Sequence, residues 1–206
     1  MSNAHIEVEQ RGPLSTKDYQ RLNTYLQQHG TFTEHKDRIV IDYADSFSHD
    51  TVSNRTKDIR LRVTNGVPEI IVKIGNWGGS EQRRELSAPS PNTPFDVLVE
   101  IFAALGMTNG ILFERKSTVY KYDDIEFALV EVPGHSYYFE AELIAHSKEE
   151  AAAAEQKIIQ TCQRLKIAVF SRDAFFKYID TLNAESNEAF DATKIPHNYF
   201  KKRFSI

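Results

Sequence analysis

Short segments of this chain alternate between apolar and charged residues. In the first of them, Glu7, Glu9 and Arg11 carry the charges, and Ile6 and Val8 lie between or beside them. Successive side chains of a β-strand point to opposite faces, so this pattern predicts a strand with one charged and one apolar face. Such segments and other β-rich runs predict eight strands, at residues 5–11, 38–44, 58–64, 69–75, 82–87, 111–122, 125–131 and 136–144.

Four helices are predicted from the residues that would start them. Ser15 and Ser147 are each followed three residues later by an acidic residue, which is the pattern of a capping box. Thr93 precedes Pro94, and proline is favoured at the first helical position. Ser171 is expected to open the last helix.

The order of these elements favours an α+β fold. Roughly eight strands with few long connections indicate an eight-stranded antiparallel β-barrel rather than βαβ units. We expect one domain over residues 1–206, with helices packed outside the barrel and a helical portion from about residue 147. The polar segment 183–194 is expected to be a loop or a lid.

A barrel covered by helices would turn its charged strand faces inward, because the apolar faces would pack against the helices. Small barrels normally fill their interior with side chains. Charges enclosed there would repel one another unless acids, bases, metal and ligand compensate them. The pattern therefore predicts a polar tunnel rather than an apolar barrel core.

Composition narrows the possible partners. The net charge of −4 gives no general attraction for nucleic acids or membranes, so any anion site must be local. Cys162 is the only cysteine, which excludes an intrachain disulfide framework and a cysteine-rich zinc site. The sequence shows neither an apolar run of the ~20 residues that a spanning helix needs nor a signal-peptide core. We expect a reduced cytoplasmic setting, and the oligomeric state stays open.

Paired charges supply the candidate chemistry. Glu7 with Glu9, and Glu140 with Glu142, each place two carboxylates roughly 6.5–7 Å apart on one strand face. Hard divalent cations such as Mg²⁺ or Mn²⁺ prefer such oxygen ligands, and phosphates prefer arginine and lysine. A single pair of this kind is usually a solvated sheet face, so it is the repetition of pairs that indicates a site for metal and polyanion. The available basic residues are Arg60, Arg62, Lys73, Arg84, Arg115, Lys116 and Lys194.

The order of these motifs resembles that of the CYTH superfamily, the triphosphate tunnel metalloenzymes. The first motif is similar to the family's Glu-x-Glu-x-Lys, with Arg11 in place of the lysine, and Lys194 is similar to a C-terminal tunnel lysine. The stretch that contains Glu85 looks especially like the thiamine-triphosphatase branch. The resemblance covers about residues 5–200, through Glu7-Val8-Glu9-Gln10-Arg11, Arg60-Leu61-Arg62, Ile71-Val72-Lys73, Arg84-Glu85-Leu86-Ser87, Phe113-Glu114-Arg115-Lys116-Ser117 and Glu140-Ala141-Glu142.

The resemblance implies a barrel that encloses a charged tunnel, with Mg²⁺ or Mn²⁺ as cofactor and a small-molecule triphosphate as substrate. It implies catalytic roles for Glu7, Glu9, Arg11 and Glu85. It implies metal binding by Glu7, Glu9, Glu140 and Glu142. It implies substrate binding by Arg60, Arg62, Lys73, Arg84, Arg115, Lys116 and Lys194.

One departure from the family pattern concerns the metal. Family members usually carry an aspartate on the strand before the closing acidic pair, where this chain has Ala128 and Val130. Glu126 lies on the same strand face as these two and could substitute. In the glycine-rich loop after Lys73, Trp77 could stack on the ring of an organic triphosphate, and a plain loop anchor is at least as good an interpretation.

Three functions follow from the resemblance. The first is metal-dependent hydrolysis of inorganic tripolyphosphate or a small organic triphosphate such as thiamine triphosphate. The second is a class IV adenylyl cyclase activity, in which the ribose 3′-oxygen of ATP attacks and pyrophosphate leaves. The third is a polyphosphate-binding module without turnover, which the departure at Ala128 and Val130 favours. Residue types do not separate the three, because all of them need the same tunnel.

Overall fold

The computed structural model describes residues 6–43, 56–75 and 80–206, and of residues 80–82 only the backbone. The strands in this part of the chain are β1 (Ile6–Leu14), β2 (Thr31–Asp42), β3 (Lys57–Thr64), β4 (Val67–Ile74), β5 (Ser80–Pro89), β6 (Asn109–Tyr122), β7 (Ile125–Val132), β8 (Ser136–Ala145) and β9 (Glu188–Asp191). The helices are α1 (Thr16–His29), α2 (Phe95–Ala104), α3 (Lys148–Arg164), α4 (Arg172–Glu185) and α5 (Tyr199–Phe204).

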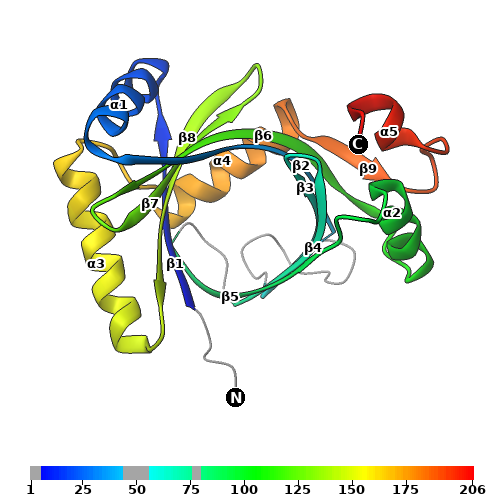
Figure 1. Ribbon diagram of the computed structural model, residues 1–206, viewed down its shortest axis with the longest axis horizontal. Coiled ribbons are helices and arrows are strands. Elements are labelled where there is room, and N and C mark those ends of the chain that lie inside the picture. The colour runs from blue at the N-terminus through cyan, green and yellow to red at the C-terminus, as the bar shows by residue number, and fades with distance from the viewer. Residues whose placement is uncertain (1–5, 44–55, 76–79) are drawn as a thin grey trace.

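Eight antiparallel strands close into a ring, which Figure 1 shows nearly end-on. Their order is β2-β3-β4-β5-β1-β8-β7-β6, and β6 returns to pair with β2. Helices α1, α2, α3 and α5 lie around the outside of this ring, and α4 crosses behind it in this view. The expected α+β fold, a barrel-like tunnel with helices packed outside, is thereby confirmed.

One hairpin turn and three helix caps have the local geometry that their residues favour. Asp123 and Asp124 join β6 to β7 with φ angles of 56° and 66°, the left-handed conformation that a two-residue hairpin turn demands. The hydroxyl oxygens of Ser15, Ser147 and Ser171 each accept a hydrogen bond from the backbone N–H three residues later. Helix α2 begins one residue later than expected, with Pro94 as its N-cap.

Segment 183–194 is more ordered than expected. Helix α4 continues to Glu185, and residues 188–191 form β9, which pairs with β6. Strand β7 pairs with β6 only from Lys116 onward, so the first residues of β6 keep a free edge on that side. The expectation of a loop or lid was wrong because β9 pairs with that edge.

The apolar strand faces look outward, as the alternation predicts. Val8, Phe139 and Ala141 lie in one buried cluster with residues of α1 and α3. Leu61 and Val63 lie in a second cluster with residues of α2 and α5. Since these apolar side chains point away from the ring, the charged side chains between them point into it.

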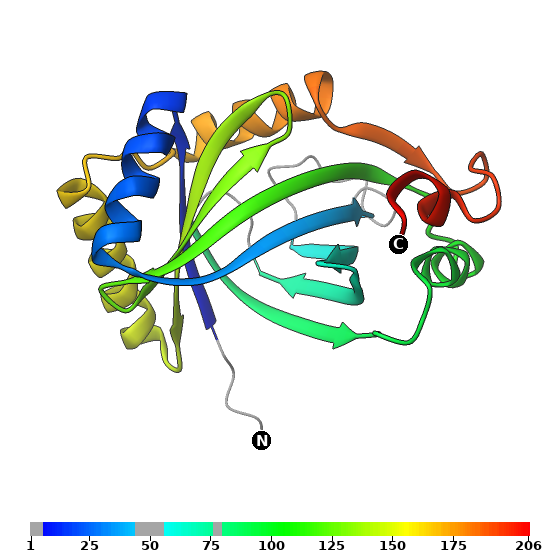
Figure 2. The ribbon, with the colours of Figure 1, turned by 45° about the horizontal axis from the view of Figure 1, so that its top comes forward.

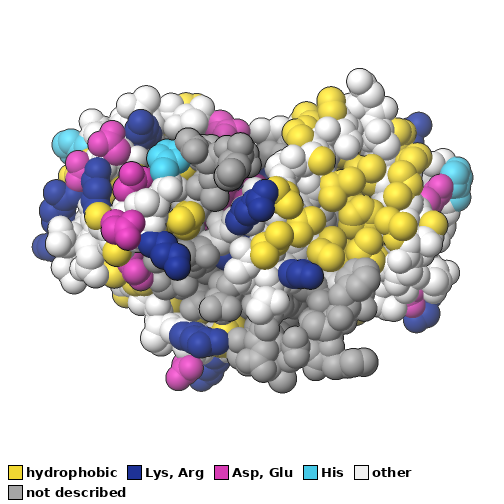
Figure 3. Space-filling model, turned by 90° about the horizontal axis from the view of Figure 1, so that it is seen from below, with side chains coloured by type: hydrophobic (Ala, Val, Ile, Leu, Met, Phe, Trp, Pro, Cys, Tyr) yellow, Lys and Arg dark blue, Asp and Glu magenta, His cyan; other side chains and the backbone are white. Residues whose placement is uncertain are grey.

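One part of the outer surface keeps apolar side chains exposed. Val97 and Ile101 of α2 and Leu105 at its C-cap form a stripe that faces solvent, and Leu86 of β5 is also exposed. Figure 3 shows a broad apolar area on the side of the molecule that carries α2. Among the described residues, no helix combines the length and apolarity needed to span a membrane.

Helix α4 reaches one end of the ring through a close crossing at β1. After α3 the chain passes so near Gly12 that an added Cβ there would lie 1.8 Å from the carbonyl oxygen of Ala168. The backbone N–H of Phe170 then donates a 2.8 Å hydrogen bond to the carbonyl oxygen of Arg11. Glycine at position 12 thus permits the path that brings α4 along one end of the barrel, as seen in Figure 2.

Candidate functional site

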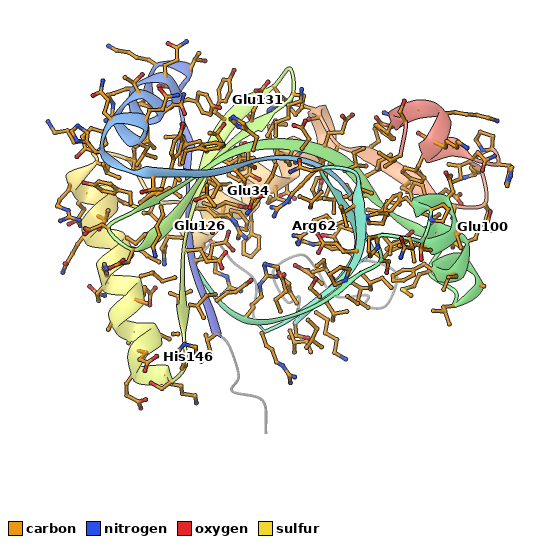
Figure 4. The ribbon with its side chains drawn as sticks, viewed as in Figure 1. Glu34, Arg62, Glu100, Glu126, Glu131 and His146 are labelled. Atoms are coloured by element: carbon orange, nitrogen blue, oxygen red, sulfur yellow. The ribbon has the colours of Figure 1, made fainter. Side chains whose placement is uncertain are left out.

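The inner face of the ring carries acidic and basic side chains from opposite parts of the sheet. In Figure 4 the label of Arg62 lies inside the ring, whereas that of Glu100 lies outside it on α2. These inner side chains form two groups of opposite charge, an acid wall and an arginine wall. The acid wall consists of Glu7 and Glu9 on β1 and Glu140 and Glu142 on β8. The arginine wall consists of Arg38 on β2, Arg60 and Arg62 on β3 and Arg115 on β6.

Strand register assembles the acid wall. Glu9 lies directly opposite Glu142, and Arg11 lies opposite Glu140. The Arg11 guanidinium contacts Glu9 at 2.6 Å and Glu140 at 3.2 Å. Burial alone would raise the pKa of Glu140, but Arg11 and Arg38 outweigh it, so the pKa is lowered and this carboxylate stays ionised.

Lys73 links the acid wall to the neighbouring strands. Its ammonium nitrogen lies 2.8 Å from carboxylate oxygens of both Glu7 and Glu85. Burial lowers the pKa of Lys73, but Glu9, Glu7 and Glu85 outweigh this effect and the net pKa is raised. Lys73 therefore remains charged and neutralises part of the acid wall.

Glu142 is the acid that this network leaves uncompensated. It forms no hydrogen bond or ion pair with any residue in ranges 6–43, 56–75 and 80–206 that the structure describes. Burial first, and then the charges of Glu7 and Glu9, raise its pKa to about 8. A carboxyl group in this position gains strongly from a cation or a proton, because either one removes the repulsion.

On the arginine wall, most guanidinium groups have acidic or amide partners. Arg62 contacts Glu69 at 2.6 Å, and Arg115 donates a 2.9 Å hydrogen bond to the side-chain oxygen of Asn187. Arg60 contacts Asp58 at 2.8 Å and Asp42 at 3.5 Å. These partners fix the guanidinium groups while leaving other N–H donors of each fork for a ligand.

Arg38 is the member of the arginine wall that lacks such a partner. Its Nε is buried and has no hydrogen-bond partner among the described residues, and no ion pair forms there either. Burial first, and then the neighbouring Arg62, lower its pKa, although Glu140 acts in the opposite direction. A buried guanidinium with unused donors is a ready binding group for phosphate oxygens.

Sequence analysis missed Arg38 because the predicted strand began there. The strand in fact begins at Thr31, and Glu34, Lys36 and Arg38 share one face of it. Their alternation with His35 and Asp37, both exposed, was a usable signal. This signal was hard to recognise because every residue from 34 to 38 is polar. The segment therefore does not alternate between apolar and charged residues.

Three of the expected substrate-binding residues lie outside the tunnel. Arg84 is exposed, because Arg83 and Glu85 occupy the inner face of β5; Arg83 contacts Asp58 at 2.5 Å. Lys116 is exposed for the same reason, since its neighbour Arg115 points inward. Adjacent residues of a strand point to opposite faces. Arg84 and Glu85 therefore cannot both point into the tunnel, and neither can Arg115 and Lys116.

Lys194 also lies away from the tunnel. It lies in the turn after β9, its side chain is 80% exposed, and it pairs at 2.8 Å with Asp191. The expected position was wrong because the chain leaves the barrel after β9 and continues outward to α5. Trp77, the expected stacking residue, lies outside the described residues.

The donor chemistry of the acid wall fits a hard divalent cation, but the ligands are not preassembled. No three acidic, histidine or cysteine side chains of the described part of the chain converge on one metal position. Ala128 lies directly opposite Glu140, so the place of the family's usual aspartate is apolar. Glu126 lies opposite Glu142, and it contacts Lys36 at 3.2 Å. To bind a metal, Glu9 and Glu7 would have to break their ion pairs with Arg11 and Lys73.

Solved structures share this fold. No family model matches the chain, and no curated protein matches its sequence. A protein of Pyrococcus horikoshii is similar with a TM-score of 0.67 and 18% identity, over 85% of this chain and 98% of its own. A candidate adenylate cyclase of Vibrio parahaemolyticus gives a TM-score of 0.57 and 16% identity, over 79% of this chain and 90% of its own.

A third relative is named for two activities. This protein of Hippeastrum is named as a candidate adenylyl cyclase with a dominant triphosphatase activity. Its TM-score is 0.53 at 13% identity, over 84% of this chain and 95% of its own. At these identities the likeness concerns the fold alone, and the activities belong to the relatives.

Proposed function

We propose that this protein is a divalent-metal-dependent triphosphatase. Its substrate would be inorganic tripolyphosphate or a small organic triphosphate bound along the tunnel. The observation that carries the proposal is that an acidic and a basic side chain on facing walls, Glu142 and Arg38, have no hydrogen-bond or ion-pair partner among the described residues. A metal ion and a phosphate chain would satisfy both at once.

In the proposed complex the arginine wall holds the phosphates. Arg38, Arg62 and Arg115 each offer planar pairs of N–H donors that match phosphate oxygens. Glu69 holds Arg62 in place, and Asn187 holds Arg115, which reduces the conformational entropy lost on binding. Phosphoryl transfer depends mostly on positioning and charge stabilisation, so such an array supplies much of what catalysis needs.

The acid wall would hold the metal, with Glu7, Glu9 and Glu142 as ligands. Bound Mg²⁺ or Mn²⁺ would neutralise phosphate charge and activate water. In the free protein Lys73 forms an ion pair with Glu7, and Arg11 forms one with Glu9. Incoming phosphate oxygens would compete with the two glutamates for these cations. Glu85 keeps Lys73 near the centre of the tunnel through this exchange.

Phosphate release tests the proposal. The purified protein is incubated with tripolyphosphate, thiamine triphosphate or ATP, with Mg²⁺, with Mn²⁺ or with chelator, and orthophosphate and cyclic AMP are both quantified. We expect orthophosphate release that requires metal. Cyclic AMP as the main product from ATP would replace the hydrolase by a class IV adenylyl cyclase, the activity for which the Vibrio relative is named.

A polyphosphate-binding module without turnover is the second candidate. It is favoured by Ala128 and Val130, which pack with Val119 and Tyr138 in a small apolar cluster where a metal ligand would otherwise lie. Tight tripolyphosphate binding without phosphate release under any metal would support this candidate. In that case Ala128→Asp is expected to introduce a metal-dependent activity, which tests the cause directly.

A further inference from the structure

An aromatic cavity lies where α4 meets the arginine wall. Its volume is about 110 Å³. The barrel contributes apolar side chains from β6 and β8, and α4 contributes the opposite wall. The apolar lining residues are Ile111, Phe113, Tyr138, Phe175, Ile179 and Leu182.

This cavity is continuous with the phosphate-binding part of the tunnel. Arg11, Arg60 and Arg115 line it together with the apolar side chains, and so do the carboxylates of Glu140 and Asp42, which pair with Arg11 and Arg60. The guanidinium of Arg11 lies 5.3 Å from the ring centre of Phe175, and that of Arg115 lies 4.6 Å from the ring centre of Phe113. A molecule that contacted the aromatic rings would therefore have its charged end within reach of the same arginines.

Hydrogen bonds hold the α4 side of the cavity in place. The Tyr178 hydroxyl lies 2.8 Å from the hydroxyl of Ser136 at the start of β8. Arg115 donates to the side-chain oxygen of Asn187, whose amide nitrogen donates to the side-chain oxygen of Asn183 at 2.8 Å. These contacts tie the middle and the C-terminal end of α4 to the barrel, so this wall of the cavity is preformed.

We propose that this cavity binds the aromatic ring of an organic triphosphate, whose phosphates extend along the arginine wall. The placement of the phosphates rests on the proposed function. At about 110 Å³ the cavity is smaller than the closed cavity of about 150 Å³ that accommodates benzene, so a single ring would fill it and extend toward the tunnel residues that also line it. Aromatic walls favour a flat ring through offset or edge-to-face contacts.

The test compares a substrate that has a ring with one that lacks it. Thiamine triphosphate and tripolyphosphate serve as probes, and both equilibrium binding without metal and kcat/KM with Mn²⁺ are measured. Ile179→Trp places a large side chain in the cavity, and Ile179→Ala removes apolar contact from it. Asp180→Trp is the matched control, since Asp180 is the next residue of α4 and is exposed to solvent.

We expect Ile179→Trp to lower the ratio of thiamine triphosphate to tripolyphosphate, in affinity and in kcat/KM, by at least tenfold. Ile179→Ala is expected to lower the same ratios about threefold, and Asp180→Trp to leave them within twofold of wild type. Melting curves establish whether each variant is folded. If Ile179→Trp does not fold, the comparison of Ile179→Ala with wild type decides the test.

The two proposals fail in different ways. Ratios unchanged in a folded Ile179→Trp, or wild-type protein that binds tripolyphosphate but not thiamine triphosphate, would overturn the ring site and leave the triphosphatase intact. Binding of thiamine triphosphate that responds to Ile179→Trp, without any phosphate release, would support the ring site and overturn the triphosphatase.

Discussion

The two charged walls of the tunnel differ in how completely their charges are compensated. On the arginine wall, Arg62 has Glu69 and Arg115 has Asn187, and Arg38 is left without a partner among the described residues. On the acid wall, cations neutralise Glu7 and Glu9, but Glu142 faces both of them without a cation of its own among the described residues. The two side chains without partners are an acid on one wall and a base on the other, and this difference is the basis for proposing a metal ion beside the first and a phosphate chain beside the second.

The largest expected effect comes from removing the uncompensated acid. Glu142→Gln keeps the shape of the side chain but removes its charge and one oxygen ligand. We expect kcat/KM for tripolyphosphate with Mn²⁺ to fall at least ~100-fold, about 2.7 kcal/mol in transition-state stabilisation. Phosphate release and Mn²⁺ titration check this result.

The control is Glu131→Gln. Glu131 lies in the β7–β8 hairpin that also carries Glu142, and it pairs in register with Lys116 and Tyr137. Its parity places it on the strand face opposite to that of Glu126 and Ala128. We expect near wild-type activity from it. Wild-type activity in Glu142→Gln would exclude Glu142 as a metal ligand.

A smaller effect is expected on the arginine wall. Arg38→Ala and Arg62→Ala should each weaken tripolyphosphate binding by about 1.5–3 kcal/mol, the range for hydrogen bonds to charged groups. Their effects on folding should differ, because Arg62→Ala leaves the carboxylate of Glu69 without its cation, whereas Arg38→Ala breaks no hydrogen bond or ion pair among the described residues.

Calorimetric titration and melting curves separate these two consequences. Arg62→Ala is expected to lower Tm, and Arg38→Ala to keep or raise it. Lys116→Ala, on the outer face, should change neither binding nor stability by more than ~0.5 kcal/mol. Equal losses of binding in Arg38→Ala and Lys116→Ala would contradict the placement of phosphates on the arginine wall.

The smallest effect is a dependence of stability on pH. The pKa of Glu142 is raised to about 8 in the folded protein, from 4.5 without burial, so the folded state retains a proton that the unfolded state releases between these values. The contribution of this group to stability is therefore complete below about pH 4.5 and is lost as the pH rises toward 8. Without metal, Glu142→Gln should exceed wild type in stability by roughly 1–3 kcal/mol at pH 8, and by little at pH 5.

Melting curves of both proteins at pH 5 and pH 8 measure this difference. The variant minus wild-type difference in Tm should grow with pH, and by no more than ~10 °C. A difference that stays constant between the two pH values would mean that Glu142 is already ionised at pH 5. Repulsion within the acid wall would then be weaker than the geometry indicates.

Alternation along single strands predicted much of the fold and of the inner face. Glu7, Glu9, Lys73 and Glu142 follow from period two, because one buried outer face fixes the orientation of every second side chain. The same rule explains the misplacement of Arg84, since it cannot share a face with the adjacent Glu85. Local pattern is therefore sufficient where a strand has clear apolar contrast.

Features that depend on chain path were not predictable in this way. The position of Lys194 follows from β9 pairing with the free edge of β6, and no local signal specifies that pairing. The aromatic cavity depends on α4 crossing one end of the barrel, which requires the close approach of Ala168 to Gly12. Its apolar lining residues come from β6, β8 and α4, so their proximity is a tertiary property.

The most direct test of the account is whether metal and triphosphate strengthen each other's binding. In the free protein, Lys73 and Arg11 occupy acids that a metal needs, and phosphate oxygens would draw these cations away. Mn²⁺ is titrated calorimetrically into the protein with and without saturating tripolyphosphate, with Mn²⁺ binding to tripolyphosphate alone subtracted. We predict that tripolyphosphate tightens Mn²⁺ binding at least ~10-fold, within the usual range of coupling energies. Equal Mn²⁺ affinity in both titrations would contradict the claim that the two walls act as one site.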